Sequence, residues 1–165
     1  MKNIKAIIFD AYGTLFDVNS AAEKCKNKIG DKWEAFANFW RTTQLEYTWL
    51  RSLMKRHKDF WQITGDSLDK SMKVFNIEPS MKNELLDLYR VLSCYPEVKD
   101  TLDKLSEKNY KLAILSNGTP SLLNHLVSNN NLKKTFDDIF SIEEVGIFKP
   151  DSNVYEIPIK KYKIQ

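Results

Sequence analysis

The chain has 165 residues, of which 42% are hydrophobic and 28% are charged, and it contains only five glycines and five prolines. This composition is typical of a globular protein and excludes a disordered or fibrous chain. The formal net charge is only +3 and lysine and glutamate are interspersed, so we expect no nucleic-acid partner. No apolar stretch approaches the length of a membrane span, so we expect no membrane partner either.

The N-terminus leads directly into an apolar run and does not resemble a signal peptide. The two cysteines, Cys25 and Cys94, match no metal-binding or redox spacing. We therefore interpret them as reduced thiols of a cytoplasmic protein. His57 and His125 have no metal-ligand partner at helical spacing, and we expect neither to be catalytic. We also expect His57 to lie at the surface, in the solvated end of a helix over residues 55–58.

Three short apolar runs have the pattern of buried parallel strands: Ile4–Phe9, Lys111–Leu115 and residues 139–142. Each run is followed by a loop and then by a helical pattern, and two of these helices are predicted near residues 98–105 and 122–127. Alternation of strand, loop and helix predicts an α/β fold, with a doubly wound, Rossmann-like parallel sheet and crossover helices.

Between the first two strands the chain has far more residues than one crossover helix needs. Apolar residues recur at helical spacing over 33–40 and again over 85–92, and no convincing strand interrupts them. We therefore predict that residues 18–95 form an inserted helical cap above the sheet. The sheet domain is then discontinuous and consists of residues 1–17 and 96–165.

Polar side chains follow each predicted strand, and the carboxyl ends of parallel strands meet at one edge of a sheet. Asp10 ends the first strand, Ser116 and Asn117 end the second, and Lys149 follows the third. A strand-end aspartate can be aimed as a nucleophile, and a nearby lysine keeps it ionised. Thr14 can donate or accept a hydrogen bond in the first loop. A purely structural aspartate–lysine pair is the alternative for any one of these residues.

These motifs carry a resemblance to a known family. The stretch Asp-Ala-Tyr-Gly-Thr-Leu at residues 10–15 resembles the nucleophile loop of the haloacid dehalogenase superfamily. Residues 116–118 and 149–151 are similar to its second and third motifs, and the predicted helical insertion occupies the place of its cap domain. The resemblance spans the whole chain, with the three motifs in the expected order.

Tyr12 distinguishes between activities within this superfamily. Phosphatases of the superfamily carry a second aspartate two residues after the nucleophile, which protonates the leaving alcohol and contributes to Mg²⁺ binding. A tyrosine is a poor acid at neutral pH and can line an apolar pocket. Tyr12 therefore favours cleavage of a carbon–halogen bond without a cofactor. A Mg²⁺-dependent phosphatase of the same fold remains the alternative.

Residues 39–53 resemble the cap segment of the type II 2-haloacid dehalogenases, which act on L (S) enantiomers. This resemblance implies that Arg41 reaches the departing halide and that Leu45 and Phe60 line the apolar side of the substrate. The alternatives are an arginine with a solvated head on an amphipathic helix, and two ordinary residues of the cap core.

The resemblance implies a two-step hydrolysis of a small-molecule 2-haloacid. Asp10 attacks C2, expels halide toward Arg41 and forms an ester, and water then attacks the carbonyl carbon of that ester. Ser116 and nearby backbone N–H groups are expected to hold the substrate carboxylate, while Asn117 orients the substrate or the nucleophile loop. Lys149 is expected to offset the two negative charges that meet in the site. The resemblance also implies a homodimer, consistent with apolar cap helices.

The last part of the chain departs from the family pattern. Tyr155 matches a family tyrosine at the site, with packing on the sheet as its alternative. The family continues beyond the third motif into a further strand and a loop that positions the hydrolytic water, whereas this sequence stops at Gln165. We therefore expect an unpaired sheet edge and impaired ester hydrolysis. A non-catalytic remnant, or a subunit completed by another chain, is the alternative. Pro158 is expected to disturb the last helix unless it lies within the first turn.

Overall fold

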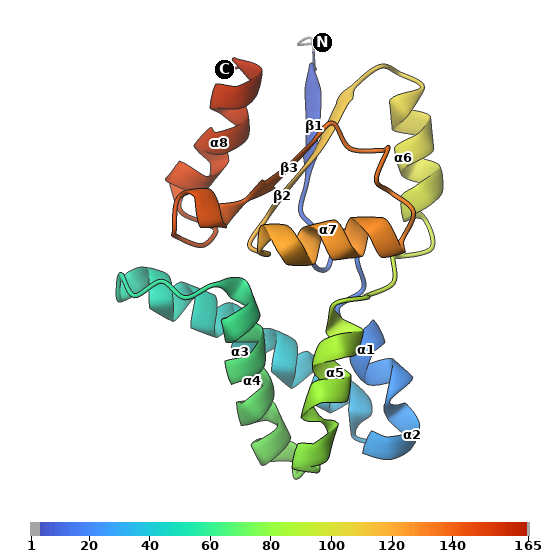
Figure 1. Ribbon diagram of the computed structural model, residues 1–165, viewed down its shortest axis with the longest axis vertical. Helices are drawn as coiled ribbons and strands as arrows, with labels where there is room; N and C mark the ends of the chain where they lie inside the picture. Colours follow the sequence, from blue (N-terminus) through green and yellow to red (C-terminus); the bar gives the residue numbers. More distant parts are fainter. Residues whose placement is uncertain (1–3, 165) are drawn as a thin grey trace.

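A computed structural model describes residues 4–164 of the chain. Figure 1 shows two layers, a parallel sheet with flanking helices and a separate group of helices beyond one end of the sheet. The strands and helices are β1 (Ala6–Phe9), α1 (Ser20–Lys24), α2 (Lys26–Ile29), α3 (Trp33–Leu53), α4 (Phe60–Phe75), a 3-10 turn (Pro79–Met81), α5 (Lys82–Tyr89), α6 (Val98–Ser106), β2 (Lys111–Ser116), α7 (Pro120–Asn129), β3 (Asp138–Ser141), a 3-10 turn (Ile142–Glu144) and α8 (Ser152–Tyr162).

The three strands form one parallel sheet in the order β1-β2-β3. The predicted α/β fold is therefore confirmed. Strand β2 lies in the middle and is buried from Leu112 to Ser116, which explains its continuous apolar sequence. Strand β1 forms an edge and is only partly buried. It begins at Ala6 rather than at the predicted Ile4, which is 60% exposed.

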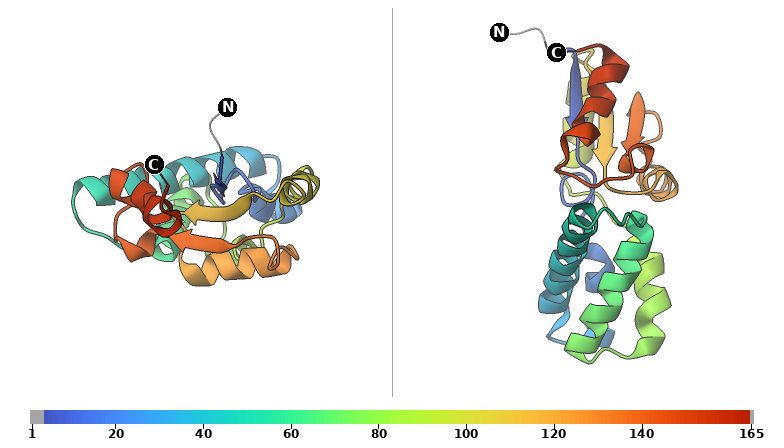
Figure 2. Two further views of the ribbon diagram at one scale, coloured as in Figure 1. Left: turned by 90° about the horizontal axis from the view of Figure 1, so that it is seen from above. Right: turned by 90° about the vertical axis from the view of Figure 1, so that its left-hand side faces the viewer.

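Helices α6 and α8 lie on opposite faces of the sheet (Figures 1 and 2). Pro158 lies inside α8, and the helix continues to Tyr162. The predicted disturbance is therefore wrong. Val154, Ile157 and Pro158 are all buried along this helix. Burial of this apolar stripe offsets the backbone hydrogen bond that proline cannot make.

Helices α1 to α5 pack together beyond the carboxyl ends of the strands (Figure 1). Their shared core is apolar and aromatic: the Trp40 ring lies 5.2 Å from that of Tyr89, and Phe36 and Leu85 are fully buried. No helix in the part of the chain from 4 to 164 is long and apolar enough to span a bilayer.

Two chain segments, residues 15–17 and 93–95, run side by side where the helical layer joins the sheet layer. The Asp17 backbone N–H donates to the Ser93 carbonyl at 2.8 Å, and the Tyr95 N–H donates to the Leu15 carbonyl at 3.1 Å. Phe16, fully buried, forms an isolated antiparallel bridge with Cys94. These bonds hold the segment that leaves the sheet layer against the segment that returns to it. We call this pair of hydrogen-bonded segments between the two layers the neck.

Asp137 fixes the start of the central strand. Its carboxylate accepts a hydrogen bond from the Leu112 backbone N–H at 2.9 Å and pairs with Lys111. These two donors, led by the Lys111 side chain, lower the pKa of Asp137 below the usual value of an aspartate. A carboxylate with a lowered pKa stabilises the folded chain above the titration range of the unfolded group, and this contribution is lost as the pH falls.

We expect Asp137→Asn to lower the free energy of unfolding by about 1 kcal/mol at pH 7, because the charged acceptor is replaced by a neutral one. The difference from the wild type should begin to narrow below about pH 4, where the unfolded aspartate takes up its proton first, and should vanish only below the lowered pKa of the folded state. Urea unfolding at several pH values measures this. Asp103→Asn, which changes an exposed residue of α6, is the control. An equal loss in both variants would contradict the assignment.

Candidate functional site

The candidate nucleophile lies in a tight turn directly after β1. The Ala11 carbonyl accepts hydrogen bonds from the backbone N–H groups of Thr14, Leu15 and Phe16. This turn requires a positive φ of 89° at Gly13, a conformation that glycine adopts without steric cost. The chain is therefore folded back on itself, and the Asp10 side chain, 41% exposed, is left at the tip of the sheet.

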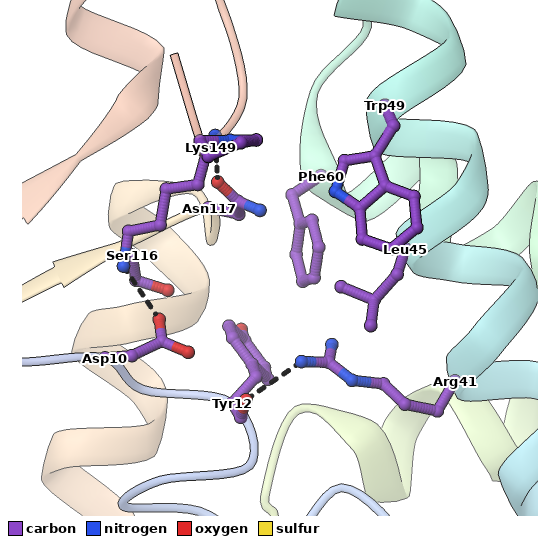
Figure 3. A pocket seen from close by; sticks show the side chains of 10 residues that line it. Asp10, Tyr12, Arg41, Leu45, Trp49, Phe60, Ser116, Asn117 and Lys149 are labelled. Atoms are coloured by element: carbon purple, nitrogen blue, oxygen red, sulfur yellow. Dashed lines mark hydrogen bonds and ion pairs between the residues drawn. The ribbon is translucent and has the colours of Figure 1, made fainter. Parts of the chain in front are cut away.

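Lys149 lies opposite Asp10 and is held from three sides. Its Nζ is 3.1 Å from the Asp10 carboxylate and also donates to the Leu115 carbonyl. Its backbone N–H donates to Oδ1 of Asn117 at 3.0 Å. Figure 3 shows this group of side chains on one wall of a pocket. Since the Lys149 side chain is only 19% exposed, its charge is directed at the carboxylate rather than at bulk water.

Ser116 ends strand β2 and is fully buried beneath the same wall. Its hydroxyl oxygen accepts a hydrogen bond from the Gly118 backbone N–H at 3.1 Å. A Cβ at Gly118 would lie only 2.8 Å from the Tyr12 ring. Glycine at this position therefore allows the loop after β2 to approach the loop after β1.

Arg41 reaches the nucleophile loop from helix α3. Its Nη2 donates to the Tyr12 carbonyl at 2.9 Å, and its Nη1 donates to the Gln44 side-chain oxygen at 2.8 Å. The alternative of an arginine with a solvated head therefore does not fit the structure. A cation from the helical layer instead lies directly above the turn that carries Asp10.

A cavity of about 500 Å³ separates the two layers. Its polar groups lie mainly on the sheet side, and its helical side is apolar except for Arg41 (Figure 3). The lining residues are Asp10, Tyr12, Arg41, Leu45, Trp49, Phe60, Ser116, Asn117, Lys149 and Pro150.

Tyr12 forms part of the apolar wall. Its ring is stacked 5.7 Å from Tyr89 and lies 5.0 Å from Phe60. Burial raises the pKa of the Tyr12 phenol well above its usual value, and the neighbouring Tyr89 raises it further. The hydroxyl is buried and has no hydrogen-bond partner within the described part of the chain. Tyr12 is thus a neutral side chain at physiological pH and supplies no second carboxylate.

Two predicted site residues lie outside the cavity. The Thr14 side chain is exposed, and the contact that holds this residue is made by its backbone N–H. Tyr155 lies on α8 and is 44% exposed, so its ring is neither in the cavity nor buried on the sheet. Thr14 lies within the loop after β1 and Tyr155 follows the loop of Lys149, but the turn and the helix direct their side chains away from the pocket.

Sequence reasoning missed three residues of this region. Trp49 lines the cavity although it is 48% exposed, and it follows Arg41 and Leu45 at intervals of four residues, which places all three on one face of α3. Pro150 lines the cavity beside Lys149. Gln44 is buried behind Arg41, and only its i+3 spacing from the arginine could have indicated a contact.

A second contact joins the helical layer to the loop before Lys149. His57 Nε2 lies 2.9 Å from the Glu143 carboxylate, and the His57 ring lies 5.0 Å from that of Phe148. The Phe148 backbone N–H also donates to the Ser52 hydroxyl at 3.2 Å. His57 is therefore only partly exposed, with 27% of its side chain accessible, and it lies in the segment after α3 rather than in the predicted helix end.

Within residues 4–164, no group of three or more histidine, cysteine, aspartate or glutamate side chains is arranged to hold a metal ion. The chemistry that the site offers is that of a carboxylate facing an ammonium group, beneath an apolar roof that carries one guanidinium. Such a site can bind a small anion with an apolar body and bring its carbon within reach of the carboxylate.

Comparisons with known proteins agree with this geometry. Residues 4–165 match the family model described as "haloacid dehalogenase-like hydrolase". The chain is 41% identical to (S)-2-haloacid dehalogenase 1 of Pseudomonas sp. (strain CBS-3), with the match covering 100% of this chain and 74% of that protein.

Solved structures give the same result. A dehalogenase crystal structure superposes with a TM-score of 0.96 at 35% identity, covering 100% of this chain and 74% of that one. The L-2-haloacid dehalogenase of Xanthobacter autotrophicus superposes with a TM-score of 0.90 at 38% identity, covering 99% and 66%. The chain belongs to the haloacid dehalogenase-like hydrolase family.

Proposed function

We propose that this protein is an (S)-2-haloacid dehalogenase, a hydrolase that converts L-2-haloalkanoic acids into (R)-2-hydroxy acids. One observation carries the proposal: the Asp10 carboxylate, 3.1 Å from Lys149, lies at the floor of a cavity whose roof is apolar except for Arg41. The relatives named (S)-2-haloacid dehalogenase support the choice of substrate.

In the first step, a carboxylate oxygen of Asp10 attacks C2 of the substrate from the side opposite the halogen. The new C–O bond forms as the C–halogen bond breaks, and halide leaves with the bonding electron pair. Arg41 lies across the cavity from Asp10 (Figure 3), and this position supports the proposed role of its cation in stabilising the departing charge. Attack from behind inverts the configuration at C2.

In the second step, water attacks the carbonyl carbon of the Asp10 ester. The bond between this carbon and the alkyl oxygen breaks, the 2-hydroxy acid departs and the carboxylate of Asp10 is restored. An ester that accumulates after the first turnover would show that this step limits the rate, and rapid steady-state release of halide would show that it does not.

The proposed substrate brings its own carboxylate into a site that already contains Asp10. Lys149 offsets this repulsion because its charge is held close to Asp10 in a half-buried position. Ser116 and the backbone N–H groups at the end of β2 are the proposed binding groups for the substrate carboxylate, and Asn117 acts by holding the Lys149 loop in place. Tyr12, Leu45 and Phe60 then contact the alkyl part.

We propose that the reaction uses no cofactor. The phosphatase alternative requires a second carboxylate at the position of Tyr12, and this side chain is an uncharged member of the apolar wall. Mg²⁺-dependent turnover of a generic phosphate ester would support the alternative. Absence of both halide release and ester formation in a chain with a sharp unfolding transition would support a non-catalytic protein.

We also propose that residues 18–95 act as a cap over the core of residues 1–17 and 96–165, and that the protein is a cytoplasmic homodimer. The paired segments at the neck support the division. Free Cys25 and Cys94 support the compartment.

The end of α3 exposes an apolar group that includes Leu50, 51% exposed, and Leu53, 80% exposed. Sedimentation equilibrium tests the dimer, which should weaken in Leu53→Asp; a wild-type monomer would contradict it.

Stereochemistry gives a direct test of the proposed function. We expect halide release from L-2-chloropropionate and none above background from the D enantiomer. Asp10, Arg41 and the groups proposed to hold the carboxylate fix three directions at C2, so the D enantiomer would turn its alkyl group away from the apolar wall. Asp10→Asn should abolish release, since an amide is a poor nucleophile. Ion chromatography of free chloride measures both. Equal rates with the two enantiomers, or an active Asp10→Asn variant, would refute the assignment.

Lys149 can be tested with a variant that keeps its length. We expect Lys149→Met to slow formation of the Asp10 ester by roughly 10²–10³-fold, because the charge that offsets two carboxylates is removed. Intact-mass spectrometry over time follows ester formation. Lys111→Met breaks a different lysine–aspartate pair outside the cavity and serves as the matched control. Equal effects of the two changes would show that the loss comes from stability alone.

A further inference from the structure

A buried hydrogen-bond network lies behind Arg41 in the helical layer. The Gln44 side-chain oxygen accepts from Arg41 Nη1 at 2.8 Å and from the Tyr89 hydroxyl at 3.1 Å. The Gln44 side-chain nitrogen donates to the Thr64 hydroxyl at 2.7 Å, and that hydroxyl donates to the Phe60 carbonyl at 2.7 Å. The network therefore joins α3, α4 and α5 at one point.

Thr64 determines which group donates and which group accepts in each hydrogen bond of Gln44. A hydroxyl has a single proton, and the Thr64 proton is directed at the Phe60 carbonyl, which has no proton to give. Thr64 must therefore accept its bond from Gln44, so the amide nitrogen of Gln44 faces Thr64. The amide oxygen is then turned toward Arg41 and Tyr89, where it meets two donors.

Burial makes this arrangement rigid. Gln44, Thr64 and Tyr89 are each almost completely buried, so water cannot replace a lost partner. The Trp40 indole N–H also donates to the Thr64 carbonyl at 3.1 Å, which fixes this turn of α4 against α3. A reversed Gln44 amide would place its N–H groups against the N–H donor of Arg41, and a guanidinium cannot accept a hydrogen bond.

Arg41 is consequently held at two ends. Gln44 holds one terminal nitrogen, and the Tyr12 carbonyl in the nucleophile loop holds the other. These two bonds use two of the five N–H groups of a guanidinium. Neither Gln44 nor Thr64 lines the cavity, so any effect they have on a reacting molecule must pass through Arg41 or through the fold.

We propose that Gln44 and Thr64 are positioning residues that orient Arg41 toward the leaving halide. The proposal rests on the proposed function, in which Arg41 stabilises the halide. A long side chain that is oriented before the reaction loses no freedom when charge develops on the halogen, and a fixed donor in a water-poor cavity stabilises that charge most effectively. Thr64 sets the direction of the Gln44 amide, and Gln44 sets the direction of the guanidinium.

The test uses Gln44→Leu, Thr64→Val and Thr64→Ser, with L-2-chloropropionate and L-2-bromopropionate as substrates. The rate of ester formation at Asp10 is followed by intact-mass spectrometry in single turnovers. Ser71→Ala is the matched control: Ser71 is buried on the same helix as Thr64, and its hydroxyl bonds to the Ser67 carbonyl, away from Gln44.

We expect Gln44→Leu to slow ester formation from the chloro substrate by roughly 10- to 100-fold, the range for a lost hydrogen bond to a charged group. Because chloride leaves less readily than bromide, the ratio of bromo to chloro rates should rise in Gln44→Leu and in Thr64→Val. This ratio does not depend on the amount of folded protein. Thr64→Ser keeps the hydroxyl and should restore the wild-type ratio, and Ser71→Ala should leave the ratio unchanged.

Three results would overturn the proposal in different ways. If the wild type neither forms an ester nor releases halide with either substrate, the proposed function fails, and the role of Gln44 fails with it. If the wild type forms the ester but Gln44→Leu and Thr64→Val keep the wild-type ratio, the dehalogenase assignment stands and the positioning role is refuted. The positioning role is also refuted if Ser71→Ala raises the ratio as much as Thr64→Val does.

Discussion

The ion pair between Asp10 and Lys149 is the interaction on which the rest of the site depends. It joins the end of β1 to the loop after β3, and the same lysine is bonded to the end of β2 through Leu115 and Asn117. Strand ends meet at one edge in any parallel sheet, whatever the loops contain. The ion pair makes this edge a charged site in which the Lys149 ammonium group faces the Asp10 carboxylate.

The helical layer gives this charged floor an apolar roof, and the contrast determines the chemistry. Leu45 and Phe60 exclude water from the side where an alkyl group would lie, so electrostatic interactions inside the cavity are stronger than in solution. Arg41 connects the two layers, because it donates hydrogen bonds to Gln44 in one layer and to the Tyr12 carbonyl in the other. The proposed catalysis therefore requires that both layers keep these contacts with Arg41.

The strands and the convergence of their polar ends could be predicted because they follow from local patterns. Short apolar runs bounded by polar residues predicted the positions of β1, β2 and β3. The order of these strands along the chain was then enough to predict that Asp10 lies near Lys149. Side-chain direction just beyond a motif could not be predicted, as the exposed Tyr155 shows. Gln44 was missed because its role depends on a neighbour twenty residues away, on α4, which no periodicity reveals.

The central claim is that Asp10 itself becomes bonded to carbon, and peptide mapping after a rapid acid quench tests it most directly. After brief incubation with L-2-chloropropionate, the account predicts a carboxyethyl ester on the peptide that contains Asp10, at the Asp10 side chain. An ester on a different carboxylate such as Asp17 would contradict it.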